Sequence, residues 1–249
     1  MFLKSTTFRA VALFCAAATT ALAQQPQLMR LSYTKVNPGM SHDYEEAAKL
    51  VSAAQKKAGA PWREVWATGI AGEFMYVGVS PIKNMAQFDS PSPVNSQLTP
   101  EQRTQYATLS RNAVRETRYV IVQHLPDLSI SSGRTSPPAL ARVTTVRTKA
   151  GRALDFEALV KNVLLPAWKK AGIKDVVVHR MVAGGVSGEY QFVQFFDKYA
   201  EVDAWPSGDK MFGGADGYKK FLDGVATTAE SAESMFARQL TELGFRNAQ

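Results

Sequence analysis

Five side chains on predicted strands combine the residue types that could bind and transform a small aromatic molecule. A tryptophan ring packs well against aromatic groups, and an arginine guanidinium can hold a carboxylate or a phenolate. A histidine can exchange a proton near neutral pH. We therefore predict a small-molecule site in which His179 is the candidate catalytic residue. The candidate ligand-binding residues are Trp66, Arg30, Arg142 and Tyr76.

Strand alternation predicts which face these side chains share. We expect four apolar residues to pack on the covering helices: Leu31, Val65, Val143 and Val178. The opposite face, toward the space between two sheets, would then carry Arg30, Ser32, Trp66, Arg142, Thr144 and His179. A purely structural interpretation stays open. In it the tryptophan fills the core, the histidine is a strand residue with its hydrogen bonds made, and the arginines lie at strand ends in solvent.

Two other kinds of chemistry involve the histidines. His179 could be the axial ligand of a haem, although the sequence contains no attachment motif for one. His42 begins an acidic segment, HDYEE (42–46), but the matching segment of the second half has Leu154 in its place. We interpret 42–46 as a solvated helix start and predict no metal site. The sequence also contains no phosphate-binding G-x-x-x-x-G-K motif and no dinucleotide fingerprint.

These residues lie in an internal repeat. QKKAG at 55–59 returns as WKKAG at 168–172, and GEFMYV at 72–77 resembles GEYQFV at 188–193. The distance between matching residues drifts from 112 to 113 and then to 116, which is what insertions between two copies of one unit produce. The first drift falls beside Pro166, where we expect a bulge or kink in a helix.

Each copy has the same predicted element order. Strands and helices alternate as β-α-β-β-α-β, and KKAG ends the first helix of each copy with a left-handed glycine. A T-x-x-Q capping box at 99–102 starts the second helix of copy one. The predicted strands are 30–36, 63–70, 74–79, 119–125, 141–147, 176–183, 190–196 and, weakly, 235–243. The predicted helices include 42–59, 154–172 and 218–238.

This order is that of the ferredoxin-like split βαβ unit. One such sheet is covered by helices on a single face, so its other face stays apolar and exposed. Two sheets can cover each other, which explains why the unit is doubled. We predict an α+β fold of two tandem ferredoxin-like units that form one intrachain barrel.

The N-terminal sequence is typical of an export signal. Residues 1–23 combine Lys4 and Arg9 with a short apolar run that ends in a small-x-small cleavage pattern. Cys15 is the only cysteine, so the mature chain would have no disulfide and no thiolate metal site. We predict a periplasmic or secreted protein with copy one at 24–128, a polar linker at 129–139 and copy two at 140–249.

Charge and hydropathy narrow the predicted partners. The formal net charge is +7, but no Lys/Arg run is clustered as in a typical nucleic-acid site, so we expect no nucleic-acid partner. No apolar run of membrane length follows residue 23, so we expect no membrane partner after signal removal. A homodimer remains open.

The β-α-β-β-α-β order and the strand-to-helix turn VNPGMSHDYEEAAK (36–49) resemble the dimeric α+β barrel superfamily. That superfamily includes antibiotic-biosynthesis-type monooxygenases, stress-responsive barrels and NIPSNAP-like proteins. The resemblance spans nearly all of the mature chain, in two copies. It implies the fold, and it implies a range of activities from cofactor-free oxygenases and haem-binding enzymes to proteins without known activity.

The leading functional prediction is an exported protein that binds a small, partly aromatic ligand between its two sheets. One alternative is a cofactor-free or haem-dependent monooxygenase-type enzyme, and another is a ligand-free protein-interaction module. No cofactor is expected in the leading prediction, whereas haem belongs to the enzyme alternative. The identity of the ligand and the presence of catalysis stay open at this stage.

Overall fold

Strands and helices follow one another in the order predicted for two β-α-β-β-α-β units. The computed structural model describes residues 27–134 and 136–247, so the predicted signal at 1–23 lies outside the described residues. The strands are β1 (Leu28–Val36), β2 (Trp62–Thr68), β3 (Tyr76–Ile82), β4 (Val114–His124), β5 (Leu140–Thr148), β6 (Val176–Ala183), β7 (Glu189–Phe196), β8 (Ala229–Gln239) and β9 (Phe245–Arg246). The helices are α1 (Ser41–Lys57), α2 (Pro93–Gln97), α3 (Pro100–Ala113), α4 (Ala153–Leu159), α5 (Leu165–Lys170), α6 (Tyr199–Asp203), α7 (Gly208–Phe212) and α8 (Ala215–Thr228).

Eight strands close into one antiparallel barrel. The neighbours run β3-β1-β4-β6-β7-β5-β8-β2, and β2 pairs with β3 again to complete the ring. Each copy supplies four adjacent strands, and the copies join at two seams, β4–β6 and β2–β8. The fold prediction is confirmed, with the detail that the two sheets meet edge to edge and enclose a common interior. Closure leaves the eight barrel strands without a free edge.

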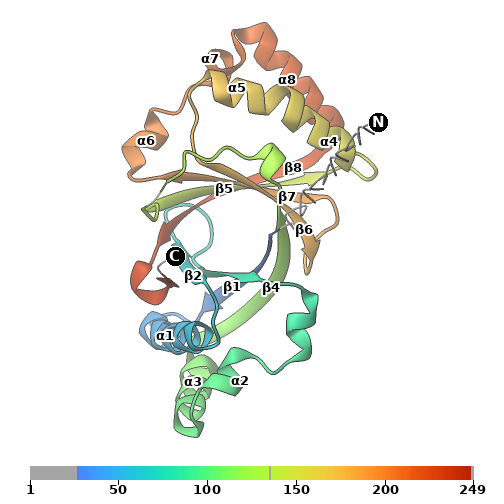
Figure 1. Cartoon of the computed structure of the whole chain (residues 1–249). Helices are drawn as coiled ribbons and strands as arrows, with labels where there is room; N and C mark the ends of the chain where they lie inside the picture. The colour runs from blue at the N-terminus through green and yellow to red at the C-terminus, as the bar shows by residue number, and fades with distance from the viewer. Residues whose placement is uncertain (1–26, 135, 248–249) are drawn as a thin grey trace, which may run out of the picture.

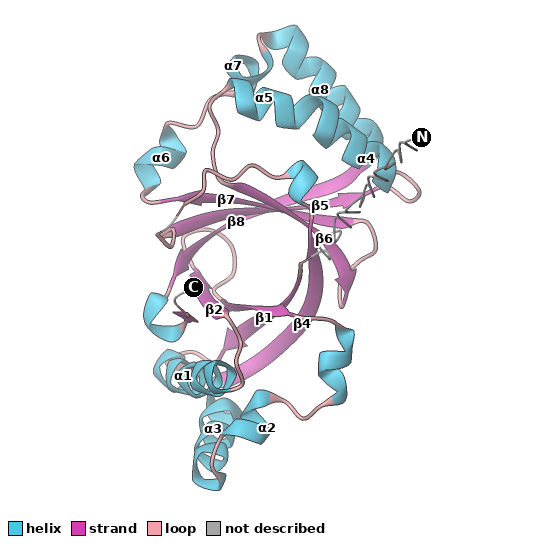
Figure 2. Cartoon of the chain, viewed as in Figure 1, coloured by secondary structure: helices cyan, strands magenta, loops and turns pink. Residues whose placement is uncertain are grey.

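Helices cover the outside of this barrel on opposite sides (Figure 1). The first copy carries α1, α2 and α3, and the second carries α4, α5, α7 and α8; Figure 2 shows the helices outside the strands on both sides. Within the described part of the chain, no helix is long and apolar enough to cross a membrane.

The barrel interior is packed with side chains from both copies. Trp66 on β2 stacks with Phe195 on β7 at 6.1 Å between ring centroids. The Gln191 side chain on β7 donates a 2.8 Å hydrogen bond to the Tyr33 hydroxyl on β1. These contacts join the first copy to the second through the interior, so each half completes the other's core.

The local signals of the repeat are confirmed by the backbone. Gly59 and Gly172 end the two KKAG segments with φ of 82° and 71°. The side chains of Thr99 and Gln102 form the reciprocal capping box of α3. A π-helical turn at Val160–Leu164 comes just before Pro166, and it absorbs the extra residue of the second copy.

The match between the two hairpins is corrected by two residues. Tyr76 donates a 2.8 Å hydrogen bond to Glu45, and Tyr190 donates the same kind of bond to Glu157 at 2.6 Å. Strand pairing agrees. Thr34 and Val146 are matching residues of the two copies, and Thr34 pairs with Tyr76 as Val146 pairs with Tyr190. Tyr76 thus corresponds to Tyr190, 114 residues later, and not to Phe192 as the 116-residue match implied.

The predicted helix at 218–238 is wrong in its second half. The helix α8 ends at Thr228, and the next residues form β8, which pairs with β5 over its length and with β2 near its end. The helix-favouring sequence AESAESMFAR is overridden because β5 and β2 offer backbone partners on both sides. The ring could not close without this strand.

Replacing Gly184 at the β4–β6 seam is expected to lower the free energy of unfolding. Its φ is +80°, and a Cβ atom there would lie 2.2 Å from the Tyr119 carbonyl oxygen. Gly39 is a matched control, since its φ is +77° and a Cβ would meet nothing within 4 Å. We expect Gly39→Ala to cost about 1–2 kcal/mol from backbone strain alone, and Gly184→Ala to cost clearly more. Urea denaturation of both variants measures this, and equal costs would contradict the close approach at the seam.

Candidate functional site

The five residues predicted from sequence do not share one cavity. Trp66 belongs to the packed interior of the barrel, and His179 lies on its interior face. Tyr76 is buried under α1 beside Tyr44. Arg142 stacks over Trp205 on the outer face of the second copy, at 4.9 Å. Only Arg30 lines a cavity, and it does so on the outer face of the first copy.

The alternation assignment is right for β2 and β6 and reversed for β1 and β5. Val65 packs with the helices, whereas Leu31 and Val143 belong to clusters of the barrel interior. The physical reason is that the apolar residues of these two strands fill the barrel interior, while their helix-facing residues are mostly polar and partly buried. An apolar face therefore does not identify the helix side. Arg30 and Arg142 therefore point toward the helices and away from the interior.

His179 has surroundings that disfavour protonation. It faces His124 across the β4–β6 seam, with 5.8 Å between ring centroids. The Nδ1 atoms of both rings are buried and have no partner among the described residues. Burial first, and the nearby His124 second, lower the pKa of His179 to about 3. The ring is neutral at pH 7, so its surroundings do not support proton exchange with solvent near neutral pH.

A large cavity lies between the sheet of the first copy and its helices. Its volume is about 1380 Å³, and its walls come from β1, β2, β3 and β4 on one side and from α1, α2 and α3 on the other. Four basic side chains line it, and no aspartate or glutamate does so among the described residues. The basic residues are Arg30, Arg63, Lys83 and Arg111.

Arg63 lies on the sheet wall of this cavity and is 7% exposed. Its Nη1 atom donates a 3.2 Å hydrogen bond to the Ser80 hydroxyl, which in turn donates to Gln55 at 2.8 Å. The guanidinium rests on Gly78, where a Cβ atom would come within 2.8 Å of Nη2. Burial lowers the pKa of Arg63, and the positive charge of Arg30 lowers it further.

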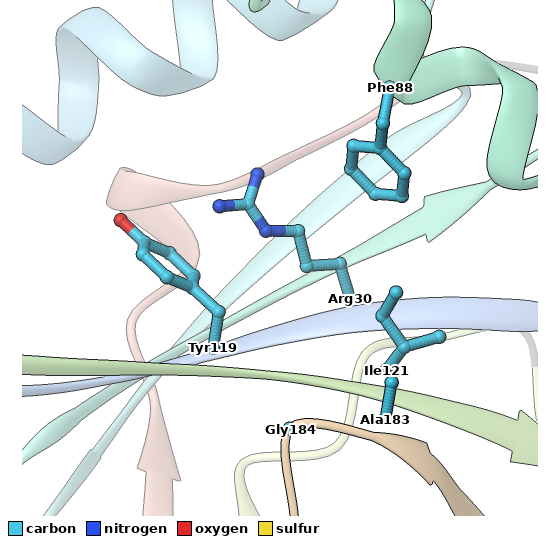
Figure 3. A pocket seen from close by; sticks show the side chains of 6 residues that line it. All are labelled: Arg30, Phe88, Tyr119, Ile121, Ala183 and Gly184. Atoms are coloured by element: carbon cyan, nitrogen blue, oxygen red, sulfur yellow. The ribbon is translucent and has the colours of Figure 1, made fainter.

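Arg30 marks a second, smaller hollow that shares residues with the large cavity. Its guanidinium lies 4.1 Å from the Tyr119 ring centroid and 5.9 Å from that of Phe88. Figure 3 shows the guanidinium between these two rings, with Ala183 and Gly184 of the second copy below. This hollow has a volume of about 270 Å³. Aromatic faces and a cation are thus available together at this end of the cavity.

The second copy fills the corresponding space with apolar side chains. Trp168 stands at the position of Gln55 in the KKAG repeat, and it packs edge-on against Phe192 at 6.0 Å. Strand pairing places Phe192 at the position of Gly78 and the fully buried Val176 at that of Arg63. Each of these three positions is small or polar in the first copy, and together they open its cavity.

The cavity does not fit a histidine-ligated haem. None of its described lining residues is histidine, cysteine or methionine. His179, the candidate axial ligand, lies on the interior face of the second copy, away from this space. No group of three or more histidine, cysteine or acidic residues that could hold a metal is found among residues 27–134 and 136–247.

Comparison with known proteins identifies the fold. No known family profile matches the chain, and no curated protein matches it. A candidate monooxygenase from Lactobacillus acidophilus is 10% identical, with a TM-score of 0.58 over 86% of this chain and 94% of that one. A candidate monooxygenase from Fusobacterium nucleatum is 10% identical, with a TM-score of 0.59 over 86% and 93%. An anthrone oxidase-like protein is 11% identical, with a TM-score of 0.54 over 87% and 92%.

At such low identity the similarity shows the fold alone. It extends over most of each chain, so the shared structure is the whole α+β barrel of two tandem units. The α+β barrel fold that the resemblance implied is supported by these structures. The narrower resemblance to NIPSNAP-like proteins stays a prediction.

The surroundings of His179 predict a specific dependence of stability on pH. An unfolded chain takes up a proton at this residue near pH 6.5, but the folded chain resists it until about pH 3. The free energy of unfolding should therefore fall as the pH drops below 6.5, by at most about 1.4 kcal/mol per pH unit for this one group. In His179→Leu the free energy of unfolding should fall less steeply as the pH drops below 6.5. Urea titrations at several pH values measure the slope, and an NMR titration of His179 with a pKa near 6.5 would contradict the expectation.

Proposed function

We propose that this protein binds a small, partly aromatic molecule in the cavity between the first sheet and the helices α1, α2 and α3. One observation carries the proposal: the first copy keeps this space open where the second copy fills it with Trp168, Phe192 and Val176. The ligand position therefore moves from the barrel interior, where it was expected, to the outside of the first sheet. The interior is occupied by packed side chains from both copies.

The chemistry of the cavity wall supports an aromatic ligand. Tyr44, Tyr106, Tyr119 and Phe88 line the space, and aromatic rings with a few polar groups are usual in small-molecule sites. Burial raises the pKa of Tyr44, so its hydroxyl stays protonated and can donate a hydrogen bond. The volume of about 1380 Å³ is ample for one or two fused rings with substituents.

A monooxygenase-type activity is the second candidate function. Two of the structurally similar proteins are described as candidate monooxygenases, and a third as anthrone oxidase-like. The basic lining favours this candidate, because positive charge stabilises an ionised aromatic substrate and an ionised ring gives up electrons to oxygen more easily. The protein-interaction alternative gains no comparable support from the described residues.

We also propose that the protein is exported after removal of residues 1–23. The charged start, apolar run and small-x-small pattern support this proposal. N-terminal sequencing of the mature protein from its native host is expected to begin at or near Gln24. A mature protein that still starts at Met1 would contradict it.

Filling the cavity should abolish ligand binding. Gln55→Trp copies the residue of the second half into the first, whereas Gln55→Ala leaves the space open and serves as the matched control. The carboxylate 2-naphthoate and the neutral 2-naphthamide are suitable aromatic probes, and calorimetry measures their affinity. We expect Gln55→Trp to weaken both by at least about tenfold, which corresponds to about 1.4 kcal/mol.

Two outcomes would count against the proposed function. If neither probe binds the wild-type chain, or if Gln55→Trp binds them as the wild type does, the cavity is not a ligand site. Oxygen consumption with an ionisable substrate such as anthrone tests the second candidate in the same variants. Consumption that persists in Gln55→Trp would place that activity elsewhere.

A further inference from the structure

The guanidinium of Arg63 carries a positive charge without an opposite charge beside it. No salt bridge reaches it from the described residues, and the titratable groups near it are Arg30 and the hydroxyls of Tyr44, Tyr106 and Tyr119. Its Nε atom is buried without a hydrogen-bond partner. Burying such a group unpaired costs several kcal/mol in general. Natural proteins carry such locally unfavourable features mainly at functional sites.

The fold does not need an arginine at this position. Val176 holds the same place in the second copy and is fully buried in an apolar core. Position 78 is a glycine, and a Cβ atom there would lie only 2.8 Å from Nη2 of Arg63. The two copies therefore differ at two neighbouring positions. The second copy has the apolar pair Val176 and Phe192, whereas the first copy has a cation, Arg63, and the small residue Gly78 that leaves room for it.

The hydrogen bonds of Arg63 leave one nitrogen of the guanidinium available to the cavity. Nη1 is used by Ser80 and Nε is buried, whereas Nη2 makes no hydrogen bond to the rest of the described chain. A carboxylate accepts a strong, charge-assisted hydrogen bond from an arginine nitrogen. A carboxylate is also the group that neutralises the charge.

We propose that Arg63 anchors the carboxylate of the ligand, so that the cavity selects small aromatic carboxylates over their neutral analogues. This inference rests on the proposed function, because it names the chemical class of the molecule that the cavity binds. The aromatic part of the ligand would lie among the tyrosines of the cavity wall. The other basic residues of the lining, Arg30, Lys83 and Arg111, raise the local concentration of anions.

Calorimetry with the matched probes tests the inference on the full mature chain. The wild type should bind 2-naphthoate at least about tenfold more tightly than 2-naphthamide, as a charge-assisted hydrogen bond to the carboxylate implies. Arg63→Met should erase that preference and leave the affinity for 2-naphthamide nearly unchanged. Arg152→Met removes a positive charge from the other copy, where Arg152 pairs with Asp155, and should keep the preference.

Thermal unfolding supplies a readout that a structural role would not produce. Because Arg63→Met removes an unpaired buried charge, its Tm without ligand should equal or exceed that of the wild type. At one fixed concentration, 2-naphthoate should raise the Tm of the wild type by more than that of Arg63→Met, whereas 2-naphthamide should raise both equally. If Arg63→Met fails to fold, Arg63→Gln tests the same point, since it removes the charge, keeps a hydrogen-bond donor and should lose the preference.

The results separate this inference from the proposed function. Equal wild-type affinity for the two probes, or a preference that survives in Arg63→Met, would overturn the carboxylate anchor and leave the ligand cavity standing. A lower Tm in Arg63→Met together with an intact preference would assign Arg63 a structural role. Failure of both probes to bind the wild type would overturn the cavity and the anchor together.

Discussion

The hydrogen bonds at the two seams of the barrel are the constraint on which the rest of the structure depends. A four-stranded sheet leaves unpaired N–H and C=O groups along both edges, and here each edge of one copy is satisfied by an edge of the other. Closure fixes which face of every strand is inside. It also places the helices of the two copies on opposite outer sides of the barrel (Figure 1).

Apolar packing and open space are divided unequally between the two copies. The second copy packs Phe156, Trp168 and Phe192 into a continuous apolar core under its helices. The first copy has a smaller core around Tyr44 and Tyr76, and the remaining space is the basic cavity. Shared contacts across the interior, such as Gln191 with Tyr33, couple the less filled half to the more filled one. A site with unfavourable buried charge can exist because its partner half is well packed.

The sequence carries the architecture more fully than it carries the site. Repetition, helix stops and the Thr99 capping box identify the elements, because each is a local feature of few residues. The faces of β1 and the strand β8 escape prediction, because they depend on partners far away in the chain. Arg63, Gly78 and Gln55 were missed, although aligning the copies shows a signal: each differs from its counterpart in charge or size. The copy boundaries and the export signal stay predictions.

The covalent link between the halves has a consequence for stoichiometry. β4 leads through the segment around Ile130, which bridges to Val176, directly into β5 of the second copy. In a barrel built from two identical chains, every substitution occurs twice, and a cavity in one half implies a cavity in the other. Joining the halves in one polypeptide breaks that symmetry. Each barrel therefore contains one open cavity of this kind, under the helices of the first copy. The equivalent position in the second copy is filled with side chains.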